Sequence, residues 1–181
     1  MRLRSDRRSY EKIHEEMEVI MTPELDEMLP PAPEEIYSAY IGFVRAYHLW
    51  MHGAHNVTKG TGFGGDHELI YGKIYLETQE AIDMIIEKGM GIYQDEGIAC
   101  PMRIVENAAM ILSDWESPSN HDAERIADLA LEYTKQLVGV GTGTSEILKE
   151  MGALTYGTDN MLAGLVDTHE NYAYLLQQRT K

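Results

Sequence analysis

Residues 46–75 read AYHLWMHGAHNVTKGTGFGGDHELIYGKIY, two apolar-striped segments joined by a glycine-rich turn. His55 ends the first segment, and His67 lies just inside the second. Asp83 and Glu87 lie further along that second segment, four residues apart, which puts them on one face of a helix. Imidazole nitrogens and carboxylate oxygens on helices that pack together suit iron, zinc or manganese. These four residues are the first candidates for a metal site.

The composition is typical of a single globular domain. The chain has 181 residues, of which 44% are hydrophobic, so it can bury a core. No apolar run approaches the roughly 18 residues of a membrane-spanning helix, and we expect no membrane association. Cys100 is the only cysteine, which excludes an internal disulfide and favours a reducing compartment. We expect a cytoplasmic protein, because the N-terminus also lacks the apolar stretch of a secretory signal.

The charge distribution is strongly acidic except at the N-terminus. A net charge of −15 repels nucleic acid and attracts cations. The first eight residues carry an excess of arginine, namely Arg2, Arg4, Arg7 and Arg8. Such an arm can bind DNA phosphates with a strongly salt-dependent affinity, or it can be a solvated terminus. Because the rest of the protein is acidic and repels DNA, we favour the solvated terminus and expect at most weak DNA binding.

Helical periodicity recurs along the chain, whereas the alternation typical of strands does not occur over a useful length. Residues 9–28 hold a short amphipathic pattern, and prolines at 30, 31 and 33 separate it from the first long helix. We assign residues 1–32 to an N-terminal extension, a basic arm plus a short amphipathic helix, and residues 33–181 to the main domain. The helices expected in that domain span residues 33–57, 66–88 and 101–113, then one from beyond the 117–120 loop to about 151, and one from 158 to near the C-terminus.

Single residues set two of these boundaries, and three glycines fall inside another of the expected helices. Gly89 is expected to end the second helix, and Thr158 to cap the last one. Gly139, Gly141 and Gly143 would together cost about 3 kcal/mol relative to alanine in a helix interior. We expect a distorted but continuing helix at these glycines.

The order of the helices is typical of a ferritin-like four-helix bundle. The long link falls between the second and third long helices, so it can carry the chain from one end of the bundle to the other. Those two helices then run parallel, and the short helix at 101–113 lies in the crossover. The sequence therefore predicts an all-α, ferritin-like bundle with one extra helix in the crossover and an N-terminal extension.

Three stretches resemble the Dps family, the small bacterial ferritins that protect DNA and store iron. The first runs from HLW at 48–50 through AHNV at 54–57 to Phe63 and HEL at 67–69, and its interval between the two histidines agrees with the family. The second, IDMIIEK at 82–88, is similar to the family's acidic pair. The third, residues 158–176, resembles its last helix, and the three stretches occur in the family's order.

This resemblance implies a hollow, dimer-based shell of twelve subunits with an iron site between two subunits. His55 and His67 of one subunit would face Asp83 and Glu87 of its neighbour. Ferrous iron would bind there, an oxidant, commonly peroxide, would take its electrons, and the ferric product would be stored inside. The resemblance thus implies a ferroxidase that sequesters iron, and zinc or manganese would suit the same ligands.

Three departures from the family pattern affect this site. Asn56 stands where the family has a tryptophan, and Tyr71 stands where it has an aspartate four residues beyond the second histidine. The interval from His67 to Asp83 is one residue longer than in the family, which would rotate a regular helix by about 100°. A π-bulge near Gly72 would absorb the extra residue.

A regular helix is the alternative. Glu68 would then take the place of the second histidine, and Gly72 that of the missing aspartate. In either register Glu80, one turn before Asp83, is a candidate substitute for that aspartate. The full set of metal candidates is His55, His67, Glu68, Glu80, Asp83 and Glu87. The alternative function is a catalytically silent ferritin-like assembly or structural protein with a degenerate metal site.

The remaining histidines and tyrosines are assigned to packing or to the surface. We expect His48 in the core, and His52, His121 and His169 on the surface without partners. The tyrosines assigned to the core or to an interface are Tyr71, Tyr75, Tyr172 and Tyr174. Tyr71 is also a candidate electron donor near the metal.

Overall fold

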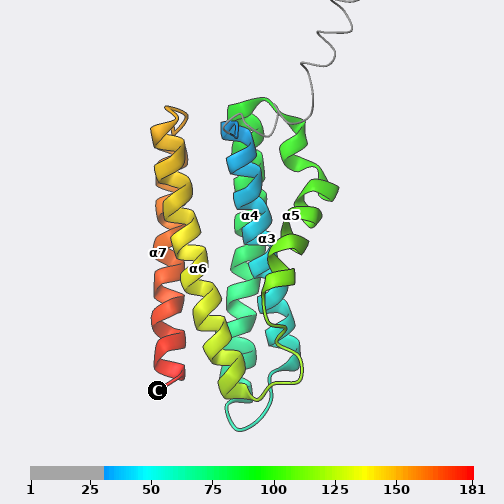
Figure 1. The fold of residues 1–181 in the computed structure, drawn as a ribbon. Helices are drawn as coiled ribbons and strands as arrows, with labels where there is room; N and C mark the ends of the chain where they lie inside the picture. Colours follow the sequence, from blue (N-terminus) through cyan, green and yellow to red (C-terminus); the bar gives the residue numbers. More distant parts are fainter. Residues whose placement is uncertain (1–30) are drawn as a thin grey trace, which may run out of the picture. The chain divides into compact units, whose positions relative to one another are not determined.

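A computed structural model describes residues 31–181; the predicted arginine arm and amphipathic helix lie outside these residues. The α-helices are α3 (Pro33–Val57), α4 (Lys73–Tyr93), α5 (Pro101–Asp114), α6 (Ala123–Glu150) and α7 (Tyr156–Arg179) (Figure 1). A π-helix, η1 (Gly65–Gly72), precedes α4, and a short 3₁₀ helix, η2 (Glu96–Ala99), precedes α5. No strand occurs within residues 31–181, so the predicted all-α class is confirmed.

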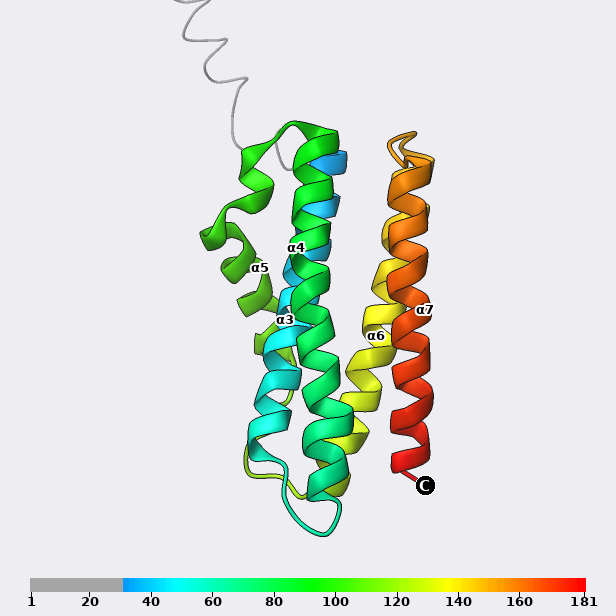
Figure 2. The same ribbon diagram turned by 180° about the vertical axis from the view of Figure 1, so that it is seen from behind.

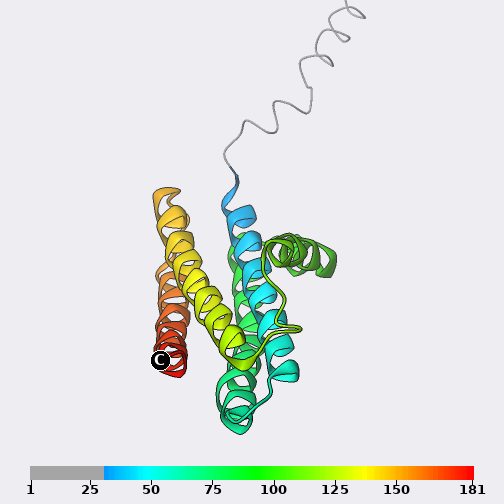
Figure 3. The same cartoon turned by 60° about the horizontal axis from the view of Figure 1, so that its bottom comes forward.

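The four long helices form a bundle, and α5 lies on its outside (Figures 1 and 2). The connection through η2 and α5 carries the chain from one end of the bundle to the other, so α4 and α6 run parallel. α5 packs along α3 on the side away from α7, which Figure 3 shows from a third direction. This is the predicted ferritin-like architecture with its crossover helix. None of the helices in the described part of the chain is both long and apolar enough to cross a bilayer.

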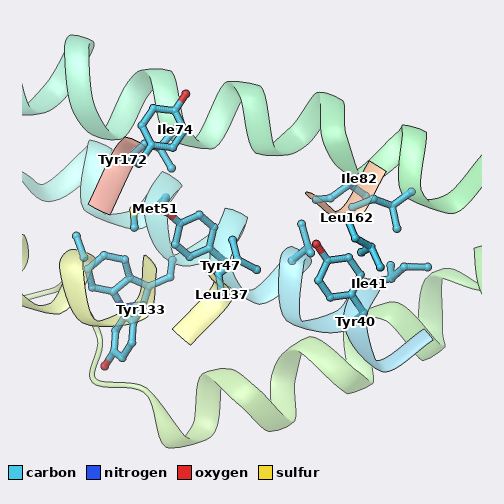
Figure 4. Close-up of a cluster of buried hydrophobic side chains, with 14 of the residues drawn as sticks. Tyr40, Ile41, Tyr47, Met51, Ile74, Ile82, Tyr133, Leu137, Leu162 and Tyr172 are labelled. Carbon is cyan, nitrogen blue, oxygen red and sulfur yellow. The ribbon is translucent and has the colours of Figure 1, made fainter. Parts of the chain in front are cut away.

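The core of the bundle is rich in tyrosine and isoleucine (Figure 4). Tyr47 is fully buried, and its hydroxyl donates to Oγ1 of Thr134 at 2.8 Å. The Thr134 hydroxyl donates in turn to the Ala130 carbonyl at 2.7 Å. These bonds join α3 to α6 and satisfy polar groups that would be costly to bury alone.

The start of α7 corrects a predicted boundary. Thr155 is the N-cap, because its hydroxyl accepts the backbone N–H of Thr158 at 3.1 Å. Thr158, the predicted cap, is instead buried in the first turn. Both threonines can cap a helix, and the hydrogen bond to the Thr158 N–H decides for Thr155.

Gly89 lies inside α4, so the predicted helix end there is wrong. A Cβ atom at this position would lie 2.4 Å from Cε1 of Tyr37 on α3. The glycine therefore allows a close approach of the Tyr37 ring to the backbone of α4. The helix continues to Tyr93, and Gln94 ends it in the left-handed conformation with φ 53°.

We expect Gly89→Ala to destabilise the fold by about 2 kcal/mol, because the added methyl group must displace a packed ring. The Tyr37 hydroxyl donates to the Ile85 carbonyl at 2.9 Å, which resists that movement. Gly91→Ala is the matched control, since nothing lies within 4 Å of its added Cβ. There the better helix propensity should stabilise the protein by up to about 1 kcal/mol. Denaturant unfolding of both variants measures the difference, and equal effects would contradict the close approach.

α6 continues without interruption past its three glycines, so the predicted continuation is confirmed. Gly141 has a packing reason, because a Cβ atom there would lie 2.9 Å from Cγ2 of Val166 on α7. Gly139 and Gly143 have no such neighbour within 4 Å.

Candidate metal centre

The structure brings His55 and His67 together. His55 lies in the last turn of α3, and His67 lies in η1 beyond the glycine-rich turn. Their rings are stacked, with centroids 3.7 Å apart and an interplanar angle of 16°. The ring of Phe63 stacks on the far side of the pair, 4.8 Å from His67.

Each of these two histidines is held by the backbone of the other. Nδ1 of His55 donates to the His67 carbonyl at 2.8 Å, and Nδ1 of His67 donates to the His55 carbonyl at 2.8 Å. Because a carbonyl oxygen only accepts, both Nδ1 atoms carry the hydrogen. In the neutral rings the lone pairs then belong to the two Nε2 atoms. Histidines that bind metals are typically held in this way, with the other ring nitrogen donating to a carbonyl.

His67 lies near the start of the π-helix η1. This π-helix confirms the predicted π-bulge near Gly72, and it makes the regular-helix alternative, with Glu68 in the histidine's place, wrong. Gly72 ends η1 where a Cβ atom would lie 2.6 Å from the His67 carbonyl oxygen and 3.3 Å from Nδ1 of His55. Only glycine fits there without displacing the histidine pair.

An ion pair from the C-terminal end of the chain anchors η1. Asp66, directly before His67, is buried, and Arg179 of α7 binds both of its carboxylate oxygens. The Arg179 Nε to Asp66 Oδ1 distance is 2.9 Å, and Nη2 to Oδ2 is 3.0 Å. This bidentate geometry fixes the orientation of the Asp66 carboxylate and also compensates its negative charge.

Tyr75 and His52 extend the aromatic surface beside the histidine pair, and sequence reasoning missed this. The ring of Tyr75 on α4 lies 5.0 Å from that of His55 and stacks on that of His52 at 4.6 Å. His52 is exposed as predicted, but the expectation that it has no partner is wrong. The spacing of three residues between His52 and His55 was the available signal, because it puts both on one helix face.

His48 is buried, so its assignment to the core is confirmed. Burial, with smaller effects of Arg45 and His52, lowers the pKa of His48 to about 4, so the ring is neutral at physiological pH. His121 is not without a partner, because its Nε2 lies 2.9 Å from Oε1 of Glu116. His169 is buried rather than on the surface, which corrects a second expectation.

Solved structures share this architecture at low sequence identity. A Dps protein from Vibrio cholerae O1, described as a member of a broad superfamily of ferritin-like diiron-carboxylate proteins, matches with a TM-score of 0.67 and 16% identity, over 82% of this chain and 89% of its own. A Dps protein from Bacillus brevis matches with a TM-score of 0.68 and 16% identity, over 84% of this chain and 100% of its own. The chain has the Dps-like ferritin fold. No protein-family model and no curated protein matches the sequence.

Within this Dps-like fold Glu68 is the acidic candidate that lies beside the histidine pair of the same chain. In residues 31–181 no group of three or more His, Cys, Asp or Glu side chains could hold a metal ion. Asp83 and Glu87 are exposed on α4. Glu68 lies nearest, with Oε1 3.4 Å from Nε2 of His67. Glu80 is also exposed on α4, where it lines a groove against α7.

Tyr71 stands where the resemblance to Dps proteins implies an aspartate, and its side chain turns into the core. The residue is fully buried, and its hydroxyl has no hydrogen-bond partner. Burial, together with the nearby charge of Asp66, raises the pKa of Tyr71. Tyr71 therefore packs as predicted and does not replace the missing carboxylate.

Proposed function

We propose that this chain is a Dps-like ferroxidase that oxidises ferrous iron at a site between two subunits and sequesters the product in a symmetric shell. The observation that carries this proposal is the histidine pair, whose Nδ1 atoms both donate to carbonyl oxygens, so that in the neutral rings both Nε2 atoms can bind a metal. Within residues 31–181 of one chain, the histidine pair supplies two nitrogen ligands but too few carboxylates lie beside it to complete a metal site. A site of this kind is completed by a neighbour.

The surface around the histidine pair favours self-association. Leu69 of η1 is 71% exposed, and Leu76 of α4 and Leu49 of α3 are also exposed. Large apolar side chains exposed on the elements that carry or adjoin the histidine pair favour a protein interface. In our proposal a second copy of the chain covers them and brings its α4 to the histidines. The oligomer is then built from dimers, with the twelve-subunit shell of Dps proteins as the expected assembly.

Iron is the substrate in this scheme. Nε2 of His55 and His67 bind ferrous iron from one side, and Asp83 and Glu87 of the partner subunit bind from the other. Nitrogen and oxygen ligands stabilise both oxidation states and leave positions open for the oxidant. Two ferrous ions give one electron each to a peroxide, whose O–O bond breaks, and two protons complete two water molecules. The same ligands suit zinc or manganese, which would compete with iron.

A silent assembly protein is the second candidate, and Tyr71 favours it. The side chain in the position of the expected aspartate is a fully buried tyrosine, which offers no carboxylate ligand. In that case the bundle would form the same dimers and shell without oxidising iron.

Loading the purified protein with ferrous iron and then adding peroxide tests the two candidates. We expect ferric absorbance to rise in proportion to subunit concentration, with the product kept in solution, whereas iron without protein should precipitate. Elemental analysis of the untreated protein is the companion measurement. An intact oligomer that neither contains nor oxidises iron would reject the ferroxidase and support the silent assembly.

A further inference from the structure

The ring of Tyr75 on α4 lies among the histidines of α3. Its centroid is 5.0 Å from that of His55, and the ring stacks on that of His52 at 4.6 Å with an interplanar angle of 30°. The ring of His48 lies 6.2 Å away. These separations are typical of aromatic rings in contact. Tyr75 therefore touches one of the proposed iron ligands directly.

Tyr71, the tyrosine that the sequence made a candidate electron donor, is placed differently. Its hydroxyl is enclosed in the core and has no hydrogen-bond partner. A phenol that gives up an electron becomes a cation unless its proton leaves, and a buried charge without a partner is costly. Tyr75 is only half-buried, so the same penalty does not apply there. Burial and ring contacts thus favour Tyr75 over Tyr71 as an electron donor.

The missing aspartate limits how much iron the site can hold. Tyr71 offers no carboxylate, so the ligands in the proposed dimer are the histidine pair of one subunit and Asp83 and Glu87 of the partner subunit. This set has one carboxylate fewer than the resemblance to Dps proteins implies. Two imidazoles with few carboxylates and open positions suit a single ferrous ion.

A single ferrous ion supplies only one of the two electrons that peroxide takes when its O–O bond breaks. Without a second donor, one of the two oxygens leaves as a hydroxyl radical, which attacks nearby side chains. A tyrosine in contact with an iron ligand can supply the missing electron, because a phenol loses an electron and a proton together without becoming charged.

We propose that Tyr75 supplies the second electron when one ferrous ion meets peroxide at this site, an inference that rests on the ferroxidase function proposed above. The ferrous ion is oxidised to ferric iron and Tyr75 to a neutral phenoxyl radical. Their two electrons break the O–O bond and convert the peroxide into two hydroxide ions. The phenol proton turns one hydroxide into water, so that one hydroxide and one water are the final products.

Rapid freeze-quench electron paramagnetic resonance tests this on the full-length protein, with one ferrous ion per subunit and one equivalent of peroxide. We expect an organic radical signal that narrows when the protein is made with ring-deuterated tyrosine. Tyr75→Phe keeps the ring beside His55 but should lose the signal, and more hydroxyl radical should be captured by a spin trap. Ferric absorbance should still form in this variant, because the iron gives up its own electron.

Tyr71→Phe and Tyr174→Phe are the matched controls. Each removes one hydroxyl group, the first from the core beside the histidine pair and the second from an exposed position of α7. Both variants should keep the radical signal. A signal that survives Tyr75→Phe, or one that disappears in Tyr71→Phe, would overturn the proposal.

The same experiment separates this proposal from the proposed function. Wild-type protein that oxidises its iron without a tyrosine radical would overturn the role of Tyr75 and leave the ferroxidase function intact. Wild-type protein that forms no ferric iron would reject both.

Discussion

Replacing His55 by alanine is expected to abolish most of the ferric absorbance that the wild-type protein builds from ferrous iron and peroxide. The substitution removes one Nε2 ligand and also the Nδ1–H bond that holds the His67 carbonyl at 2.8 Å. We expect the initial rate to fall at least tenfold, because even groups that only orient a metal ligand contribute about 10- to 100-fold. Glu87→Ala should lower the rate to a similar extent, because it removes a carboxylate that one subunit supplies to the histidines of its neighbour. Stopped-flow absorbance measures both.

His121→Ala is the control for that experiment. This substitution also removes a partly exposed imidazole, whose Nε2 lies 2.9 Å from the Glu116 carboxylate. His121 contacts neither histidine of the pair. Its oxidation rate should match the wild type. Unchanged rates in both His55→Ala and Glu87→Ala would reject the site.

The second large effect concerns stability. Arg179→Met is expected to destabilise the protein by about 3 to 5 kcal/mol, because it leaves the buried carboxylate of Asp66 without its cation. Asp66 directly precedes His67, so the change should also weaken metal binding by disordering η1. Denaturant unfolding measures the first effect, and titration with Co²⁺ under native conditions measures the second.

Arg103→Met provides the comparison for Arg179. Arg103 pairs with Asp95 at 3.9 Å, and both side chains are well exposed, at 47% and 39%. Exposed pairs contribute little, so this variant should lose less than about 1 kcal/mol. Similar losses in the two variants would show that burial of Asp66 does not matter.

Most of the fold could be predicted because it depends on local patterns. Apolar residues at helical spacing located the helices, and Pro33 marked the start of α3. One of the two boundaries that failed depends on a tertiary contact. Gly89 was predicted to end a helix, but the ring of Tyr37 occupies the space that a side chain at this position would need. No local pattern contains that contact, because the two residues lie on different helices.

The candidate site was only partly predictable, for the same reason. The spacing of His55 and His67 indicated the pair, and the extra residue before Asp83 indicated a π-bulge, which η1 confirms. The ion pair of Asp66 with Arg179 joins residues 113 positions apart, beyond any sequence pattern. The burial of His169 could have been predicted, because it lies four residues after Leu165 on the stripe that continues to Tyr172.

Subunit mixing tests the central claim most directly. His55→Ala and Glu87→Ala protein are each inactive in our account, but a dimer of one with the other regains one intact site, with histidines from the Glu87→Ala chain and carboxylates from the His55→Ala chain. Random reassociation of equal amounts makes half of the dimers mixed, so about a quarter of wild-type oxidation should return. If the mixture stays as inactive as its components although mixed dimers form, the site does not span two subunits.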